Sequence, residues 1–243
     1  MAILLLTDFG SADIYVGQMK WVLAERAPGI PVIDLLHDVP PFRIAAAAHL
    51  LAAFADRMGA GDVLVAVVDP GVGGARAAVA VRAAGRWFVA PDNGLVSVAA
   101  ARFSCAEVFS IAWRPKVLSS SFHGRDVFAP VAAMLAGGDQ AGPMLERRRA
   151  LAADFGGDDL AEIIYVDHYG NAMTGLRACN VAHEARLGVA GVRVAYAQVF
   201  SAVAEGGIFW YENSMGLVEI AANRTSAASH LGLTVGQPII VHA

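Results

Sequence analysis

The chain has 243 residues and a net charge of −4 at pH 7, with 56% hydrophobic and only 16% charged residues. This length suits one large domain or two small ones; the weak acidity argues against a nucleic-acid partner, and no apolar run reaches the ~18 residues of a membrane-spanning helix. Two distant cysteines and an N-terminus without a basic stretch predict a cytoplasmic protein with no disulfide framework and no secretion signal.

Short apolar runs alternate with helical patterns through the N-terminal half of the chain. The expected strands are 2–6, 31–36, 63–68, 77–81, 87–90 and 107–111, and the expected helices are 14–26, 43–58 and 127–135. Alternation of this kind predicts an α/β fold, with a mostly parallel sheet flanked by helices on both faces.

The pattern changes after residue 137. Up to about residue 159 it gives way to Gly, Asp, Pro and Arg, which predicts a linker in which Arg147, Arg148 and Arg149 form a solvated face. Beyond it, short strand candidates separated by turns predict a small antiparallel β-barrel-like or sandwich domain. We therefore expect an N-terminal α/β domain over residues 1–150 and a C-terminal β domain over residues 160–243.

The apolar run at residues 63–68 ends abruptly in Asp69-Pro70-Gly71-Val72-Gly73-Gly74, and Arg76 follows just past this turn. Pro70 stops the strand because it has no N–H for the ladder, and ligands of open α/β sheets bind outside such strand ends. Other strand ends carry similar polar groups. They are Asp8, His37, Asp38, Asp92, Asn93, His123, Arg125 and Asp126.

Each polar strand end taken alone is also explained as a helix cap or a turn. Brought together at one sheet edge, a carboxylate, an arginine and a histidine can position and activate a water molecule. HxxxH and HExxH motifs are absent, so no metal site is supported. A serine among residues 119–121 beside His123 is a conceivable nucleophile, but GxSxG is missing. These patterns alone indicate an α/β enzyme with a polar sheet edge.

Several long motifs, in their order along the chain, resemble the S-adenosyl-L-methionine (SAM) hydroxide adenosyltransferase family. Its members are the SAM hydrolases, and the family is related to SAM-dependent fluorinase and chlorinase. The motifs are Thr7-Asp8-Phe9-Gly10, His37-Asp38-Val39-Pro40-Pro41, Val68-Asp69-Pro70-Gly71-Val72-Gly73, Ala90-Pro91-Asp92-Asn93-Gly94, Ser121-Phe122-His123-Gly124-Arg125-Asp126, Asp167-His168-Tyr169-Gly170-Asn171 and Asn213-Ser214-Met215-Gly216. The resemblance covers nearly the whole chain.

This resemblance implies hydrolysis of SAM to adenosine and L-methionine, by attack of a water-derived hydroxide on ribose C5′. The family's catalytic set matches Asp69, Arg76 and His123. Its substrate-binding residues match Asp8 for the ribose diol, Tyr169 and Asn171 for the nucleoside, Asp167 and Ser214 for the methionine end, and Asn223 and Arg224 for adenine.

The resemblance also implies a homotrimer with active sites between subunits, and no cofactor, because SAM is the substrate. Two alternatives remain at this point. Besides a SAM hydrolase, one alternative is a chlorinase-like enzyme that transfers a halide to the same carbon, and the other is a sensor that binds SAM or adenosine without turnover. The presence of Asp69, Arg76 and His123 together favours hydrolysis, because a sensor has no need of a site that activates water.

Overall fold

The structure is a computed structural model and describes residues 1–103, 105–138 and 144–242. It divides into two compact units, Met1–Gly157 and Asp158–Ala243. Over the described residues, no helix is both long enough and apolar enough to cross a membrane.

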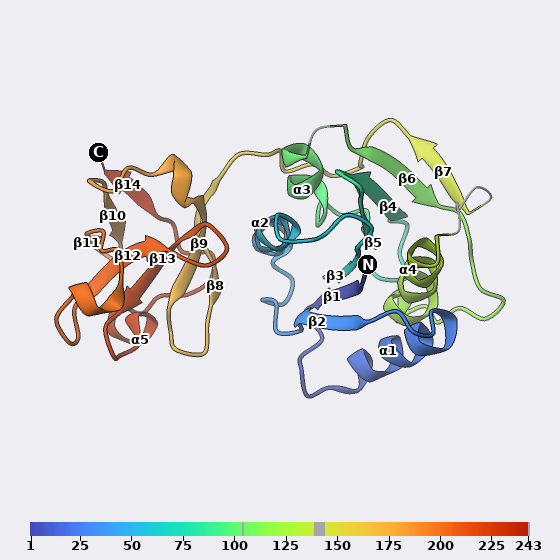
Figure 1. Cartoon of the computed structure of the whole chain (residues 1–243), viewed down its shortest axis with the longest axis horizontal. Coiled ribbons are helices and arrows are strands. Elements are labelled where there is room, and N and C mark those ends of the chain that lie inside the picture. The colour runs from blue at the N-terminus through green and yellow to red at the C-terminus, as the bar shows by residue number, and fades with distance from the viewer. Residues whose placement is uncertain (104, 139–143, 243) are drawn as a thin grey trace. The chain divides into compact units, whose positions relative to one another are not determined.

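The described part of the first unit is built on a seven-stranded sheet in the order β2-β1-β3-β5-β4-β6-β7 (Figure 1). The strands are β1 (Ile3–Thr7), β2 (Val32–Leu36), β3 (Val63–Val67), β4 (Ala78–Ala83), β5 (Arg86–Pro91), β6 (Glu107–Ile111) and β7 (Leu145–Arg148). The pairs β1–β2, β1–β3 and β3–β5 are parallel, while β4 pairs antiparallel with β5 and β6, and β7 with β6. All strands except β4 and β7 thus run one way, which confirms the mostly parallel sheet.

Helices cover both faces of this sheet (Figure 1). They are α1 (Ile14–Arg26), α2 (Ile44–Ala55), α3 (Ser97–Arg102), a π-helix (Gly124–Phe128) and α4 (Ala129–Ala136). Because side chains alternate along a strand, β1 sends Ile3 and Leu5 into one core with α1 and α4, and Leu4 and Leu6 into another with α2 and α3. A sheet buried on both faces explains why β1 and β3 are uninterrupted apolar runs.

The segment predicted as a linker contains a strand. Residues 139–143 of it lie outside the described residues, but β7 pairs with β6 at the edge of the sheet. Arg148 donates from Nη1 to Oδ2 of the fully buried Asp92 at 2.5 Å. The prediction of a solvated face was therefore wrong for Arg148, although the neighbouring Arg147 is exposed. Sequence spacing missed this ion pair because its partners are far apart along the chain.

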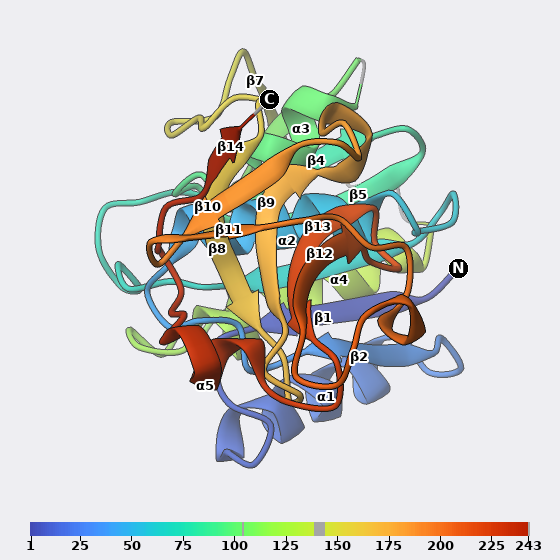
Figure 2. The ribbon, with the colours of Figure 1, turned by 90° about the vertical axis from the view of Figure 1, so that its left-hand side faces the viewer.

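The described residues of the second unit form two antiparallel sheets, β12-β13-β9-β8 and β11-β10-β14. Figure 2 shows this second unit with its strands labelled. Its elements are β8 (Leu160–Val166), β9 (Ala172–Arg177), β10 (Arg186–Val189), β11 (Val192–Val194), β12 (Ile208–Glu212), β13 (Leu217–Ala222), β14 (Ile240–His242), the 3₁₀ helices Ala178–Asn180 and Phe200–Ala202, and α5 (Ala227–Leu231). Trp210, 1% exposed, lies in the core and donates from Nε1 to the Ala185 carbonyl. The antiparallel prediction is confirmed, but these residues do not form a closed barrel.

The Asp92–Arg148 pair gives a test of the packing at the sheet edge. Asp92→Ala should lower the free energy of unfolding by about 2–3 kcal/mol, because it removes a buried charge-assisted contact and leaves a cation without its partner. Urea unfolding measures this change. The matched control is Glu107→Ala, whose partner Arg147 is 72% exposed, and it should cost less than about 1 kcal/mol. Equal losses in both variants would contradict the assignment.

Candidate active site

The candidate active site of the first unit begins where β3 ends. Arg76 Nε donates to Asp69 Oδ1 at 3.0 Å, and Arg76 Nη2 donates to Asp69 Oδ2, so the guanidinium grips the carboxylate with two hydrogen bonds. The same Nη2 lies 3.1 Å from His123 Nδ1. Arg76 also lies over the ring of Phe128, 5.4 Å from its centroid. The three side chains expected to be catalytic therefore meet in one cluster.

The contact with Arg76 fixes the state of the His123 ring. A guanidinium can only donate hydrogen bonds, so Nδ1 must accept and the single ring proton lies on Nε2. Burial lowers the pKa of His123 below its ordinary value of 6.5, and the charge of Arg76 lowers this pKa further against the opposing carboxylates of Asp69 and Asp126. The geometry and the direction of this shift agree on a neutral imidazole near pH 7.

Two contacts hold the turn after β3 in place. Gly73 has a φ of +77°, and a Cβ there would lie 2.2 Å from the carbonyl oxygen of Ser120. Only glycine lets the two loops approach this closely. Asn93, after β5, donates from Nδ2 to the carbonyl of Val68 at 2.9 Å, directly before Asp69. Asn93 thus supports the site from outside it.

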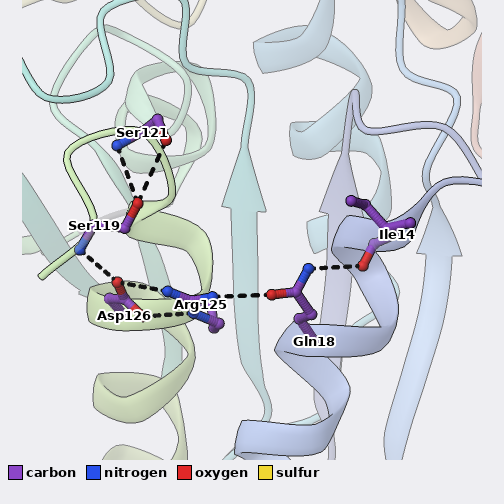
Figure 3. Close-up of polar contacts among 6 residues, drawn as sticks. All are labelled: Ile14, Gln18, Ser119, Ser121, Arg125 and Asp126. Carbon is purple, nitrogen blue, oxygen red and sulfur yellow. Dashed lines mark hydrogen bonds and ion pairs between the residues drawn. The ribbon is translucent and has the colours of Figure 1, made fainter.

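A polar network holds the loop that carries His123 (Figure 3). The Ser119 N–H donates to Asp126 Oδ2 at 2.7 Å, and Arg125 Nε donates to Asp126 Oδ1 at 2.6 Å. Arg125 then reaches across to α1, where its Nη1 donates to Gln18 Oε1 at 2.9 Å and Gln18 donates to the carbonyl of Ile14 at 3.1 Å. This network ties the start of the π-helix, which follows His123, to a neighbouring helix.

A cavity of about 450 Å³ opens beside this cluster at the ends of β1 and β3. Its lining residues are Asp8, Phe9, Tyr15, Pro41, Phe42, Val67, Asp69, Pro70, Val72, Ser121, Phe122, His123 and Gly124. Burial raises the pKa of Asp8, and the nearby charge of Asp69 adds to the rise, while hydrogen bonds from the N–H groups of Phe42 and of Asp8 itself oppose it. Phe42 has a strained φ of 64°, and no motif in the sequence predicts that it belongs to the site.

Of the eight polar groups expected at the other strand ends, Asp8 and His123 line this cavity and the remaining six do not. His37 and Asp38, directly after β2, are two of those six. His37 Nδ1 lies 2.8 Å from the hydroxyl oxygen of Thr7, and its Nε2 lies 3.1 Å from Asp34 Oδ1. Asp38 accepts from the Ser11 N–H at 3.3 Å. His37 thus joins the end of β2 to the last residue of β1, and Asp38 joins it to the loop after β1, so for both residues the explanation as local structural groups is the better one.

The second unit has a cavity of its own, of about 710 Å³. The lining residues are Asp167, Tyr169, Asn171, Phe200, Tyr211, Ala222, Arg224, Thr225 and Ser226. Four of the expected binding residues are thus among them. Asn223 and Ser214 are not, and Asn223 instead donates from Nδ2 to the Val203 carbonyl at 2.6 Å.

Hydrogen bonds preset several groups at this second cavity. Asp167 Oδ1 accepts from the N–H groups of Tyr169 and Asn171, and Oδ2 accepts from Asn171 Nδ2 at 2.9 Å. The Tyr211 hydroxyl donates to Oε1 of the buried Glu219 at 2.5 Å. Burial raises the pKa of Tyr211, and the Glu219 carboxylate raises it further, so the phenol stays protonated. Sequence analysis missed Phe200 and Tyr211, because an aromatic residue in a β domain looks the same whether it packs in the core or lines a cavity.

Within the described residues, no group of three or more His, Cys, Asp or Glu side chains is arranged to hold a metal ion. At the first cavity, the described residues place the Asp69–Arg76–His123 cluster and Asp8.

Comparison with known families decides the relationship. Residues 3–144 match the SAM hydroxide adenosyltransferase N-terminal domain, and residues 161–240 match its C-terminal domain. The chain belongs to the SAM hydroxide adenosyltransferase family. Among its relatives are two proteins named (R)-S-adenosyl-L-methionine hydrolase. The protein from Thermus thermophilus is 41% identical, and the match covers 96% of each chain. The protein from Salinispora arenicola is 38% identical, and the match covers 98% of this chain and 96% of the relative.

The fold agrees with this family assignment. An uncharacterized conserved protein from Thermotoga maritima superimposes with a TM-score of 0.90 at 32% identity, over 99% of this chain and 100% of that one. A protein named fluorinase, from an Actinoplanes species, is more distant at 24% identity over 97% of this chain and 95% of its own length.

Two substitutions should move the pKa of His123 in opposite directions. Arg76→Met removes a cation beside Nδ1 and leaves the Asp69 carboxylate unpaired, so the pKa should rise. Asp69→Asn removes an anion that favours the imidazolium, so the pKa should fall further. NMR titration of the His123 ring protons measures both shifts, and a change in the same direction would contradict the cluster.

The same titration has a consequence for stability. Since the folded protein binds this proton less tightly than the unfolded chain, the part of the free energy of unfolding that depends on His123 falls as the pH drops below 6.5.

Proposed function

We propose that this protein hydrolyses SAM to adenosine and L-methionine. The observation that carries the proposal is the Asp69–Arg76–His123 cluster beside a cavity of about 450 Å³, in a chain whose relatives are named (R)-S-adenosyl-L-methionine hydrolases. In those names the L already fixes the α-carbon, so (R) describes another stereocentre. The sulfonium sulfur is such a stereocentre, because it carries three different carbon substituents. We propose that the substrate of this protein has the (R) configuration at sulfur.

The reaction is a substitution at ribose C5′. A water oxygen forms the new bond to C5′ while the bond from C5′ to sulfur breaks, and its electron pair stays on sulfur. Methionine leaves as a neutral thioether, so no general acid is needed, but the water has to lose a proton. The neutral His123 has one acceptor lone pair, on Nδ1, and Arg76 already donates to it, whereas each Asp69 oxygen that accepts from Arg76 keeps a second lone pair, so Asp69 is the better acceptor of that proton. The Arg76 cation stabilises the hydroxide as it forms.

The remaining site residues divide by their chemistry. Asp8 offers two acceptor oxygens, which suits a ribose diol. In the second unit, Tyr169 supplies an exposed ring for the nucleoside and Asn171 an amide, and Asn223 and Arg224 are assigned to adenine. Asp167 and Ser214 are assigned to the methionine end. Since both oxygens of Asp167 already accept hydrogen bonds within its turn, its role includes holding that turn.

Assembly and setting are part of the same proposal. We infer a homotrimer with active sites between subunits, no cofactor, no nucleic-acid partner and a cytoplasmic location. Sedimentation measures the oligomeric state directly, and a monomer with full activity would contradict the shared site.

Incubation of the purified protein with SAM in chloride buffer tests the function, using samples resolved at sulfur. Adenosine and methionine should form in equal amounts from the (R) epimer, as measured by chromatography. 5′-Chloro-5′-deoxyadenosine among the products would indicate halide transfer. Binding of SAM without any product would indicate a sensor, and either result would overturn the proposal.

Two conservative variants separate chemistry from binding. Asp69→Asn removes the proton acceptor, so kcat should fall by ~10²-fold or more with little change in SAM affinity. Asp8→Asn weakens a charge-assisted contact with the diol, so SAM binding should weaken by ~1.5–3 kcal/mol. Single-turnover rates and calorimetric titration measure the two effects.

The control for both variants is Asp56→Asn, an exposed carboxylate just after α2, which should change neither quantity. If Asp69→Asn loses affinity but keeps its rate, Asp69 is a binding group and the assigned mechanism is wrong.

A further inference from the structure

Three aromatic rings form one wall of the first cavity. Phe9, Tyr15 and Phe122 all line it. Their ring centroids lie 5.6 Å apart for Phe9–Tyr15, 5.7 Å for Phe9–Phe122 and 5.3 Å for Tyr15–Phe122. The Phe122 ring meets the other two edge to face, at 74° to Phe9 and 79° to Tyr15, and the Phe9 and Tyr15 rings are tilted by 52°, so none of the three pairs is a flat stack. We call this group the aromatic wall.

The aromatic wall is assembled from separate segments. Phe9 follows β1, Tyr15 lies in the first turn of α1, and Phe122 lies in the loop before the π-helix. Phe122 is 8% exposed, whereas Tyr15 is 40% exposed. The wall is therefore anchored by a buried ring and leaves ring surface accessible at the cavity. Arg125 lies over Phe122, 5.3 Å from the ring centroid, so this ring already accommodates one cation.

The charges around the cavity are unbalanced in favour of a cation. Asp69 is neutralised by Arg76, and His123 carries no charge in the form that accepts from Arg76. Asp8 also lines the cavity, and among the described residues it has no cationic partner. One negative charge and a wall of aromatic rings together suit a single positive charge that is only weakly hydrated.

We propose that the aromatic wall of Phe9, Tyr15 and Phe122 recognises the sulfonium charge of the substrate by cation–π contact. This inference rests on the proposed function, because SAM supplies the sulfonium. The reaction turns that cation into a neutral thioether, so the wall favours the substrate over the methionine product. The wall acts in binding and not in the chemical step.

The test compares two ligands that lack a sulfonium leaving group and therefore are not consumed. S-Adenosyl-L-homocysteine is neutral at sulfur. In sinefungin a carbon that carries an ammonium group replaces the sulfur. Calorimetric titration of the full chain should show that wild type prefers sinefungin. Tyr15→Leu and Phe9→Leu should each weaken sinefungin binding roughly 3- to 30-fold, which is the range expected for the loss of one cation–π contact. The same variants should change the binding of S-adenosyl-L-homocysteine much less.

Tyr15→Phe is the matched control, because it keeps the ring and removes only the hydroxyl, and it should retain the preference for the cationic ligand. In turnover of SAM, the leucine variants should raise KM more than they lower kcat. Thermal unfolding checks that each variant is folded. A wild type that binds both ligands equally or binds neither, or leucine variants that weaken both ligands by the same factor, would overturn the inference.

Failure of this inference and failure of the proposed function give different results. If the wild type hydrolyses SAM but shows no preference between the two ligands, the inference about the aromatic wall is wrong and the proposed function stands. If the wild type prefers the cationic ligand but forms no adenosine, the aromatic wall still binds a cation and the hydrolase assignment is wrong.

Discussion

The two-point contact between the Asp69 carboxylate and the Arg76 guanidinium is the constraint on which the first site depends. Removing two charges from water is costly, so such a pair is weak evidence of a stabilising role. Its value lies in position, since it fixes Arg76 against His123 Nδ1 and so fixes the tautomer of that ring. The buried strand β3 and the close approach at Gly73 hold the pair where a strand end faces a cavity.

Local features of this arrangement can be predicted from the sequence. An apolar run that ends in Asp69-Pro70-Gly71 leaves little choice about where β3 stops, and the alternation of strands and helices gave the α/β architecture correctly. The meeting of Arg76 with His123 could not be obtained from spacing, because these residues are 47 positions apart. Family resemblance grouped them before their geometry was known. Their roles in the reaction, and those of Asp8 and the binding residues of the second unit, stay predictions.

What the sequence did not reveal depends on tertiary pairing. β7 is a short polar strand whose pairing with β6 has no signature in its own residues, and Arg148 looks like its exposed neighbours until Asp92 is placed beside it. His37 looked like a member of the polar edge, but its contacts with Thr7 and Asp34 give it a structural task. From the sequence, Phe9 and Tyr15 cannot be distinguished from aromatic residues of the core or of the surface. Each of these residues has an ordinary local explanation, and only the fold decides between the explanations.

In the proposed reaction a water oxygen becomes bonded to ribose C5′. Hydrolysis of SAM in ¹⁸O-labelled water, followed by mass spectrometry of both products, tests this most directly. The label should appear in adenosine, at the 5′-hydroxyl, and the methionine should remain unlabelled, because its sulfur leaves with the electron pair. Label in the amino-acid product, or adenosine formed without label, would place bond cleavage elsewhere and contradict the assigned role of Asp69, Arg76 and His123.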